Sequence, residues 1–260
     1  MRYFVLSNKP SKGARALTRH IKLLGHKAHY RKASLWPDRL RKPKLIDTVI
    51  NWGNSYAHPK VPNGVLYYNA PTSISGASNK LAALTAMAHA GVPVPEFTTD
   101  RNVALGWLPD AYVVCRKLLR ASCGRGIVLA KSPEEVVQAP LYVKYRRKTH
   151  EYRVHVVKGT ITHIHEKRLK SAERRNDNAV NKYIRNIGND WVFCSPRDPI
   201  PDMVRTSSLQ ACTALNLDFG AVDVIYNAKF DKCYVLEVNT APGMSIGSET
   251  AIKYAKAFVQ

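Results

Sequence analysis

Two oxygen-bearing side chains stand close together in the stretch CYVLEVNTAPGM, residues 233–244. The β-branched and aromatic residues of this stretch predict a strand, which Pro242 and Gly243 end. Because side chains alternate between the faces of a strand, Glu237 and Asn239 are expected to share one face. A carboxylate and an amide oxygen on one face can serve together as ligands of a hard cation.

A third oxygen ligand comes from the preceding strand. The stretch FGAVDVIYNAKFDKCYVLEV, residues 219–238, predicts a hairpin with its turn at residues 227–232. A turn centred near Phe230 places Asp223 opposite Glu237, with Cβ atoms about 4.5 to 5.5 Å apart, where like charges repel. Mg²⁺ between them would remove the repulsion and suits two carboxylates plus an amide. The alternatives are a Lys or Arg partner, or a register that differs by two residues.

A glycine-containing turn offers a site for an anion. In RKLLRASCGRGI, residues 116–127, Ser122, Gly124 and Gly126 form a Ser-x-Gly-x-Gly pattern before an apolar strand. Glycines let backbone N–H groups approach a phosphate closely. A hairpin turn that needs positive φ angles is the alternative explanation of both glycines.

Basic residues accompany these features in a regular order along the chain. They stand on predicted strands or near the turn: Arg116, Lys117, Lys144, Arg153 and Arg185, the last followed by Asn186. Such cations can hold nucleotide phosphates while Mg²⁺ on the acids bridges them. The order predicts phosphoryl transfer by positioning and charge neutralisation.

The net charge of the chain is strongly positive. Its 260 residues include 40 Lys plus Arg against 19 Asp plus Glu, a formal charge of +21. This excess favours a polyanionic partner, such as nucleic acid, an anionic membrane surface or an acidic polypeptide. Twelve basic residues and a single acid, Asp38, lie between Lys9 and Lys44. The alternative is that these basic runs are only solvated faces.

Several classes of protein are disfavoured by composition. Five cysteines without a C-x-x-C pair indicate free thiols and neither a disulfide framework nor a zinc knuckle. No apolar run is long enough for a membrane span, so no membrane partner is expected and a cytoplasmic location is the default, host cytoplasm if the chain is viral. His155, His163 and His165 do not predict a metal site, because no Cys or well-placed carboxylate completes the set.

The pattern of elements predicts an α/β fold with three lobes. Residues 1–75 begin with a β-α-β unit made of a strand in RYFVL, a helix at 11–24 and a strand in TVINW. Residues 76–145 follow a linker and contain a helix capped by Asn79, three strands and a short helix begun by Ser132. Residues 146–260 contain a hairpin at 151–165, a long loop at 167–190, the carboxylate hairpin and a helix on each side of it.

Residues from about 79 to 258 resemble ATP-grasp carboxylate-amine ligases, most closely RimK-like enzymes and bacteriophage ATP-grasp proteins. The resemblance is carried by NKLAALTAMAHAGVPVPEFT, VVCRKLLRASCGRGIVLA, EYRVHVV, IRN, FGAVDVIY and VLEVNTAPGM, in this order. It implies an ATP-grasp fold, in which a small N-terminal α/β lobe precedes two lobes that clamp the nucleotide. It also implies ATP and Mg²⁺ as cofactors, and it makes a homo-oligomer an expectation.

The resemblance assigns roles to individual residues. Mg²⁺ would be held by Asp223, Glu237 and Asn239, and Lys117 would reach the ATP phosphates. The flexible loop over the phosphates would contain Ser122, Gly124 and Gly126, while Arg153, Arg185 and Asn186 would face the phosphate and an acyl phosphate.

The sequence departs from the family pattern at two positions. The first ATP lysine is usually followed by Pro, whereas here the order is Arg116, Lys117, Leu118, so Arg116 is the alternative residue for that role. Lys144 stands where many relatives place a Glu near the adenine.

The predicted activity is ATP-dependent formation of an amide from a carboxylate and an amine through an acyl phosphate. The substrates are a small-molecule or macromolecular carboxylate and amine, and the basic charge suggests that an amino acid is joined to a polyanionic macromolecule. The alternative is a nucleic-acid-binding protein that keeps an ATP-grasp fold without catalysis. A kinase acting on a small molecule is a third hypothesis.

Overall fold

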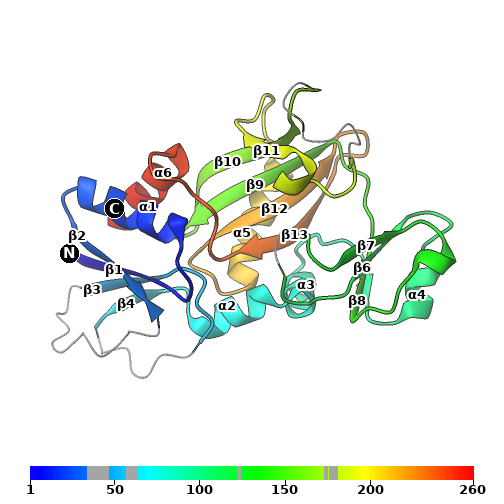
Figure 1. Cartoon of the computed structure of the whole chain (residues 1–260), viewed down its shortest axis with the longest axis horizontal. Coiled ribbons are helices and arrows are strands. Elements are labelled where there is room, and N and C mark those ends of the chain that lie inside the picture. Colours follow the sequence, from blue (N-terminus) through cyan, green and yellow to red (C-terminus); the bar gives the residue numbers. More distant parts are fainter. Residues whose placement is uncertain (34–46, 57–63, 122–123, 173–174, 176–180) are drawn as a thin grey trace.

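In the part of the chain that the structure describes, three β-sheets form the framework (Figure 1). The computed structural model describes residues 1–33, 47–56, 64–121, 124–172, 175 and 181–260. Within that part of the chain, no helix has the length and apolar composition needed to cross a bilayer.

The N-terminal lobe is a parallel four-stranded sheet with order β2-β1-β3-β4. Its elements are β1 (Arg2–Ser7), α1 (Lys12–Leu23), β2 (Lys27–Lys32), β3 (Asp47–Asn51) and β4 (Leu66–Tyr68). The Ser11 hydroxyl accepts a hydrogen bond from the backbone N–H of Ala14 and so caps α1. The predicted β-α-β unit is present, but β2 was not predicted because KAHYRK lacks an apolar run.

Two helices follow, α2 (Pro71–Ser78) and α3 (Lys80–His89). The predicted linker is therefore wrong over residues 71–78, where Pro71 occupies the first turn of a helix. The predicted cap of α3 is confirmed, since Asn79 Oδ1 accepts from the N–H groups of Leu81 and Ala82.

The central lobe is an antiparallel sheet with order β5-β8-β6-β7. It consists of β5 (Phe97–Thr98), α4 (Arg101–Leu105), β6 (Val113–Arg116), β7 (Ile127–Ala130), the 3-10 turn η2 (Pro133–Glu135) and β8 (Leu141–Lys144). The short helix predicted after Ser132 is only this single turn, and the Ser132 side chain makes no capping hydrogen bond.

The C-terminal lobe is a five-stranded antiparallel sheet with order β11-β10-β9-β12-β13. Its elements are β9 (His150–Val157), β10 (Thr160–Leu169), the 3-10 turn η4 (Ile187–Asn189), β11 (Trp191–Cys194), α5 (Asp202–Ala214), β12 (Phe219–Asn227), β13 (Lys232–Asn239) and α6 (Glu249–Val259). The predicted loop at 167–190 is shorter at its start, because β10 continues to Leu169.

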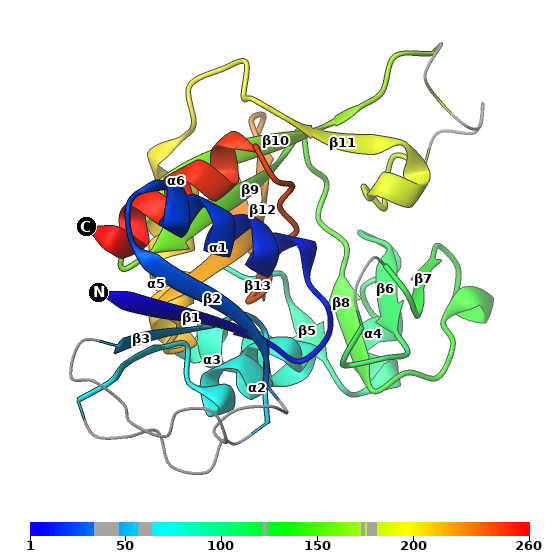
Figure 2. The ribbon, with the colours of Figure 1, turned by 60° about the vertical axis from the view of Figure 1, so that its left-hand side comes forward.

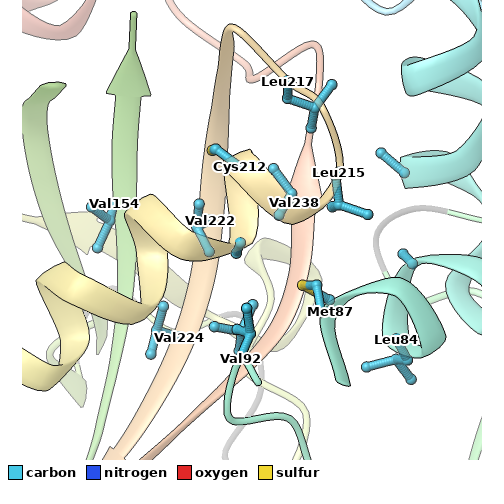
Figure 3. Close-up of a cluster of buried hydrophobic side chains, with 14 of the residues drawn as sticks. Leu84, Met87, Val92, Val154, Cys212, Leu215, Leu217, Val222, Val224 and Val238 are labelled. Atoms are coloured by element: carbon cyan, nitrogen blue, oxygen red, sulfur yellow. The ribbon is translucent and has the colours of Figure 1, made fainter. Parts of the chain in front are cut away.

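The largest core lies between one face of this sheet and helices α3 and α5 (Figure 3). Val154, Val222 and Val224 point from the strands into this core and are fully buried. The strand alternation therefore directs Arg153 and Asp223 to the opposite face. Helix α3 packs against α5 and β13. The same core includes Leu141 and Val143 of the central sheet, so the boundary proposed at residue 76 does not separate two independent cores.

Helix α6 packs beside α1 and against β10, as the views in Figures 1 and 2 agree. A hydrogen-bonded chain joins it to the sheet from Lys253 Nζ to His163 (2.9 Å), His165 (3.0 Å), His155 (3.3 Å) and Tyr254 (3.0 Å). Lys253 must donate, so each neutral imidazole accepts from one neighbour and donates to the next. No group of three metal-binding side chains is found among these or the other described residues.

A buried asparagine connects the N-terminal and C-terminal lobes. Asn69, at the end of β4, has a φ of 62° and is fully buried. Its Oδ1 accepts from the N–H groups of Asp218 (2.8 Å) and Phe219 (3.2 Å), and its Nδ2 donates to the carbonyl of Phe219 (2.9 Å). The backbone N–H of Asn69 donates to the Asp218 carboxylate at 2.6 Å. The start of β12 is thereby fixed to the N-terminal sheet.

Replacing Asn69 by Gly is expected to lower the free energy of unfolding by about 2 to 4 kcal/mol, because buried backbone groups of Asp218 and Phe219 lose their partners. Glycine tolerates the positive φ of this position, so the decrease in the free energy of unfolding measures the loss of the side-chain hydrogen bonds. Urea unfolding measures it, with the exposed Asn102→Ala as the control, expected within about 0.5 kcal/mol of wild type. Equal stability of Asn69→Gly and wild type would contradict this account.

The histidine chain predicts a stability that falls as the pH is lowered from 7.5 to 5. Burial, then the neighbouring cations and imidazoles, lowers the pKa of His165 to about 4 and that of His155 well below its usual value. The unfolded chain therefore binds protons below about pH 6.5 that the folded chain does not, so stability is complete above this pH and is lost below it.

Melting temperatures of wild type and of His155→Gln/His165→Gln, measured across this range, test the prediction. The double variant should show a shallower dependence on pH, whereas the exposed His89→Gln should keep the wild-type dependence. If the melting temperature of the double variant depends on pH as strongly as that of wild type, groups other than His155 and His165 must titrate.

Candidate active site

A cavity of about 530 Å³ lies between the central and C-terminal sheets. It is lined by β6, β7 and β8 on one side and by β9 to β13 on the other, together with the segments at residues 144–148 and 183–188. Nine of the twelve predicted site residues contribute to this lining. Lys117 and Gly126 do not, and Ser122 lies outside the residues that the structure describes.

The carboxylate hairpin has the predicted register at its functional end. Asp223 pairs directly with Glu237, and Glu237 and Asn239 both face the cavity. Beyond this pair a β-bulge makes Val224 pair with Val235, so Leu236 is an extra residue. The bulge was not predicted, and it lets Leu236 and Glu237 line the cavity together.

Cations already neutralise both carboxylates. Arg153 donates to the two Asp223 oxygens through Nε and Nη2, each at 2.7 Å, and Lys167 lies 3.5 Å from Asp223. Lys80 Nζ donates to Glu237 at 3.1 Å and to the carbonyl of Ala121 at 2.9 Å. Burial would raise the pKa of Asp223, but Arg153 and Lys167 hold it well below its usual range. The alternative of a Lys or Arg partner is therefore realised in this arrangement.

The same oxygen atoms fit a divalent cation. Two carboxylates from paired strands and the neighbouring Asn239 amide form an oxygen donor set of the kind that Mg²⁺ takes. Within the described chain no three acidic, histidine or cysteine side chains suffice to hold a metal alone, so waters or phosphates would complete the shell. Arg153 and Lys80 would then give up carboxylate oxygens that they now occupy.

A second buried ion-pair group lies beside the first. Glu151 Oε2 is 2.7 Å from Lys148 Nζ, and Glu151 Oε1 accepts from Lys167 Nζ at 2.6 Å. Burial would raise the pKa of Glu151, but the two lysines lower it. Lys167 thus connects Glu151 to Asp223. This ion-pair group was not predicted from the sequence. The signal that could have found it is the alternation of β10, which places Lys167 on the same strand face as His165.

The charge of the cavity wall is strongly positive. Of the acidic side chains that the structure describes, three line it: Glu151, Asp223 and Glu237. Nine of the described basic side chains line it as well: Lys80, Arg116, Arg125, Lys144, Arg146, Lys148, Arg153, Lys167 and Arg185. The excess of cations favours a ligand that carries several negative charges.

The alternation of side chains along β6 decides between Arg116 and Lys117, the two candidates for the first ATP-binding cation. Val113 and Cys115 are buried on one face, so Val114 and Arg116 face the cavity. Burial lowers the pKa of Arg116, and Glu237 acts in the opposite direction. Lys117 lies beyond the strand end and is exposed. The geometry thus favours Arg116 over Lys117.

Lys144 lines the cavity at the end of β8 and pairs with Glu96 at 3.2 Å. Arg146 contacts the same carboxylate and lies over the Tyr234 ring, with its guanidinium carbon 5.2 Å from the ring centroid. Both basic side chains at this end of the cavity therefore share the Glu96 carboxylate.

The turn that contains Gly124 and Gly126 contacts the C-terminal lobe. Gly124 and Gly126 have φ angles of 76° and 71°, which are favourable only for glycine. A Cβ on Gly124 would lie 2.9 Å from Asn186 Nδ2, so the turn and the 183–188 segment are in close contact. The Tyr183 ring also packs against Tyr112 and Tyr145, each with centroids 5.7 Å away. The cavity is therefore closed on this side by contacts between the two lobes.

Aromatic rings support two of the arginines. The guanidinium carbons of Arg185 and Arg153 lie 4.4 Å from the ring centroids of Trp191 and Phe193, respectively. Arg185 also donates to the carbonyl oxygen of Thr149 at 3.3 Å. Both aromatic residues belong to β11 and were not predicted, since their sequence context WVFC indicates only a strand.

The remaining part of the cavity is apolar. Its lining includes Val114, Ile127, Leu129, Val143, Ile225 and Leu236. A pocket with an apolar part and a strongly cationic part suits a planar base joined to phosphates.

Comparison with solved structures relates the whole chain to ATP-grasp proteins. The macrocyclase MdnC from Microcystis aeruginosa, bound with precursor peptide MdnA, has a TM-score of 0.67 at 12% identity over 100% of both chains. The ATP-grasp ligase PsnB, complexed with minimal precursor, Mg and ADP, has a TM-score of 0.68 at 13% identity over 99% of this chain and 95% of that one.

A RimK-domain ATP-grasp protein from Sphaerobacter thermophilus has a TM-score of 0.63 at 14% identity over 99% of both chains. No protein family and no curated protein matches the sequence. The ATP-grasp fold implied by the sequence resemblance is thereby confirmed.

Replacing Glu151 by Gln is expected to lower the free energy of unfolding by about 3 to 5 kcal/mol, because Lys148 and Lys167 lose their shared carboxylate in a buried position. Urea unfolding at pH 7.5 measures this loss. Glu151→Gln/Lys148→Gln should recover part of it, and the exposed Glu134→Gln should have little effect. Wild-type stability in Glu151→Gln would show that the lysines do not depend on the carboxylate.

Proposed function

We propose that this protein is an ATP-dependent ligase that joins a carboxylate to an amine. The γ-phosphoryl group of ATP passes to the carboxylate oxygen, which gives an acyl phosphate and ADP. The amine attacks the acyl carbon, phosphate leaves, and an amide remains. The amine loses a proton to solvent or phosphate, so no enzyme nucleophile is required.

The observation that carries the proposal is the excess of cations around two opposed carboxylates in a partly apolar cavity. A nucleoside triphosphate with Mg²⁺ matches each part of this wall. The apolar side chains suit the base, the basic side chains suit the phosphates, and the oxygen ligands suit the metal.

We assign the roles from this geometry. Asp223, Glu237 and Asn239 would hold Mg²⁺, which would neutralise phosphate charge as the phosphoryl group moves. The other assigned side chains would bind the phosphates and the acyl phosphate: Arg116, Lys80, Lys167, Arg153, Arg185 and Asn186, with Lys144 near the base and the backbone N–H of Gly124 over the phosphates. Their fixed positive charge would stabilise the tetrahedral species that forms when the amine attacks.

The substrates are proposed from charge and from the fold comparison. MdnC and PsnB were solved with the precursor peptides MdnA and PsnA2, which supports a peptide or protein as one substrate. The formal charge of +21 supports a polyanionic macromolecule, to which a small amino acid would be joined.

A nucleic-acid-binding protein without catalysis is the second candidate, and the same charge favours it. The paired acids at Asp223 and Glu237 argue against it, because a protein that only binds a phosphate backbone does not need two opposed carboxylates in its cavity.

Thermal unfolding with Mg²⁺ and ATP tests the proposal. At 100 times Kd the ligand should stabilise wild type by about 2.7 kcal/mol, which is a rise of several degrees at roughly 2 to 4 °C per kcal/mol. Asp223→Asn/Glu237→Gln should show no Mg²⁺-dependent rise, each protein being compared with its own ligand-free state.

The exposed pair Glu134→Gln/Asp202→Asn is the control and should keep the rise. A wild type that gains no stability from Mg²⁺ and ATP would refute the nucleotide site and favour the nucleic-acid binder. ADP release on adding candidate acids and amines then identifies the substrates.

A further inference from the structure

One tyrosine of the C-terminal lobe, Tyr183, packs onto a row of side chains from the central sheet. The pairing of β6 with β7 and β8, continued by one residue, places Tyr112 beside both Lys131 and Tyr145. The Tyr183 ring meets those of Tyr112 and Tyr145 edge to face, with both centroids 5.7 Å away, a geometry that aromatic pairs favour. Lys131 Nζ lies over the Tyr183 ring, 5.0 Å from its centroid. The contact thus joins one ring to three strands of the other lobe.

The row continues the face of the central sheet that lines the cavity. Val114 and Leu129 line the cavity, so the alternation of β6 and β7 places Tyr112 and Lys131 on the same side, and Tyr145 lines the cavity directly. The three tyrosine rings lie outside the hydrophobic core clusters of the described residues. Packing of a core therefore does not account for this contact.

The segment that carries Tyr183 is held together by its own hydrogen bonds. Asn181 Oδ1 accepts from the backbone N–H groups of Tyr183 (3.0 Å) and Ile184 (2.9 Å). The carbonyl oxygen of Asn181 accepts from Trp191 Nε1 at 3.0 Å, and Asn189 Nδ2 donates to the carbonyl oxygen of Ile184 at 2.7 Å. The segment from Asn181 to Trp191 therefore behaves as one unit, which Tyr183 connects to the central sheet.

The same segment carries Arg185, which the proposed function assigns to the phosphates. Arg185 donates to the carbonyl oxygens of Thr149 (3.3 Å) and Lys148 (3.4 Å), and its guanidinium lies over the Trp191 ring. These contacts fix Arg185 relative to the C-terminal sheet, but they do not fix its distance from Arg116 in the central lobe. A phosphate chain held between the two lobes requires that distance to be fixed as well.

We propose that Tyr183 is a positioning residue, which holds Arg185 at its working distance from the central lobe by packing against Tyr112, Lys131 and Tyr145. This inference rests on the proposed ligase function and adds a residue that acts through Arg185. Since the contacts involve the ring of Tyr183, phenylalanine should replace it.

Hydrogen exchange of backbone amides tests the anchoring without nucleotide. In Tyr183→Ala, peptides that cover residues 181–191 should exchange about tenfold faster or more, since two aromatic pairs and a cation–π contact are lost. Tyr112→Ala removes a partner ring from the other lobe and should also accelerate this exchange. Tyr183→Phe should stay within about twofold of wild type, because the ring contacts remain. The control is Tyr56→Ala, which removes a ring that is 65% exposed and should leave these peptides unchanged.

Titration calorimetry with Mg²⁺ and ATP tests whether Tyr183 acts through Arg185. Tyr183→Ala and Arg185→Gln should each raise the Kd about tenfold, because each weakens a charged hydrogen bond to phosphate. The variant with both changes should bind no more than about twofold more weakly than Arg185→Gln alone, since positioning has no effect once the guanidinium is gone. Tyr183→Phe should restore the wild-type Kd.

The two measurements separate this inference from the function on which it rests. A wild type that does not bind ATP with Mg²⁺ refutes the nucleotide site, and the exchange rates then still decide whether Tyr183 anchors the segment. Unchanged exchange in both Tyr183→Ala and Tyr112→Ala would overturn the anchoring. If wild type binds the nucleotide and the effects of Tyr183→Ala and Arg185→Gln on Kd multiply, the nucleotide site stands and positioning through Arg185 is wrong.

Discussion

The repulsion between Asp223 and Glu237 governs the organisation of the site. The antiparallel pairing of β12 and β13 fixes the two carboxylates opposite each other, and Asp223 is almost fully buried. Such a pair is stable only when cations approach it, because desolvation strengthens both repulsion and attraction. Lys80, Arg153 and Lys167 reach the pair from α3, β9 and β10. The positions of α3, β9 and β10 relative to the hairpin therefore depend on ion pairs with these two carboxylates.

The surrounding cations outnumber the acids, and this excess needs a second anion. Lys148 and Lys167 share Glu151, which leaves Arg116, Lys144 and Arg185 turned toward the cavity with weaker compensation. Aromatic rings beneath Arg153 and Arg185 hold the guanidinium planes without neutralising them. The cavity therefore keeps its charge for a ligand, and the Tyr183 ring joins the C-terminal lobe to Tyr112 and Tyr145 on the other side of it.

The sequence predicted those parts of the fold and site that depend on local patterns. Strand alternation and turn position were sufficient for the pairing of Asp223 with Glu237, and Asn79 marked the start of α3. The bulge at Leu236 escaped prediction because one inserted residue leaves no local signature. The sequence left Arg116 and Lys117 as alternatives for the first ATP-binding cation, and only the alternation of side chains along β6 in the structure favoured Arg116. Lys80 and Glu151 belong to the site through contacts between distant elements, which no local pattern encodes.

The position of α6 determines when the N-terminal lobe can fold. Its core unites Tyr3, Leu17 and Trp52 with Tyr254 and Phe258, and the Tyr3 hydroxyl contacts the Phe258 carbonyl across 255 positions of sequence. At ribosomal rates this apolar surface stays uncovered for roughly 10 to 50 s before α6 is made. The lobe that is synthesised first is thus completed last, and during synthesis the nascent chain exposes its most basic segment next to an incomplete core.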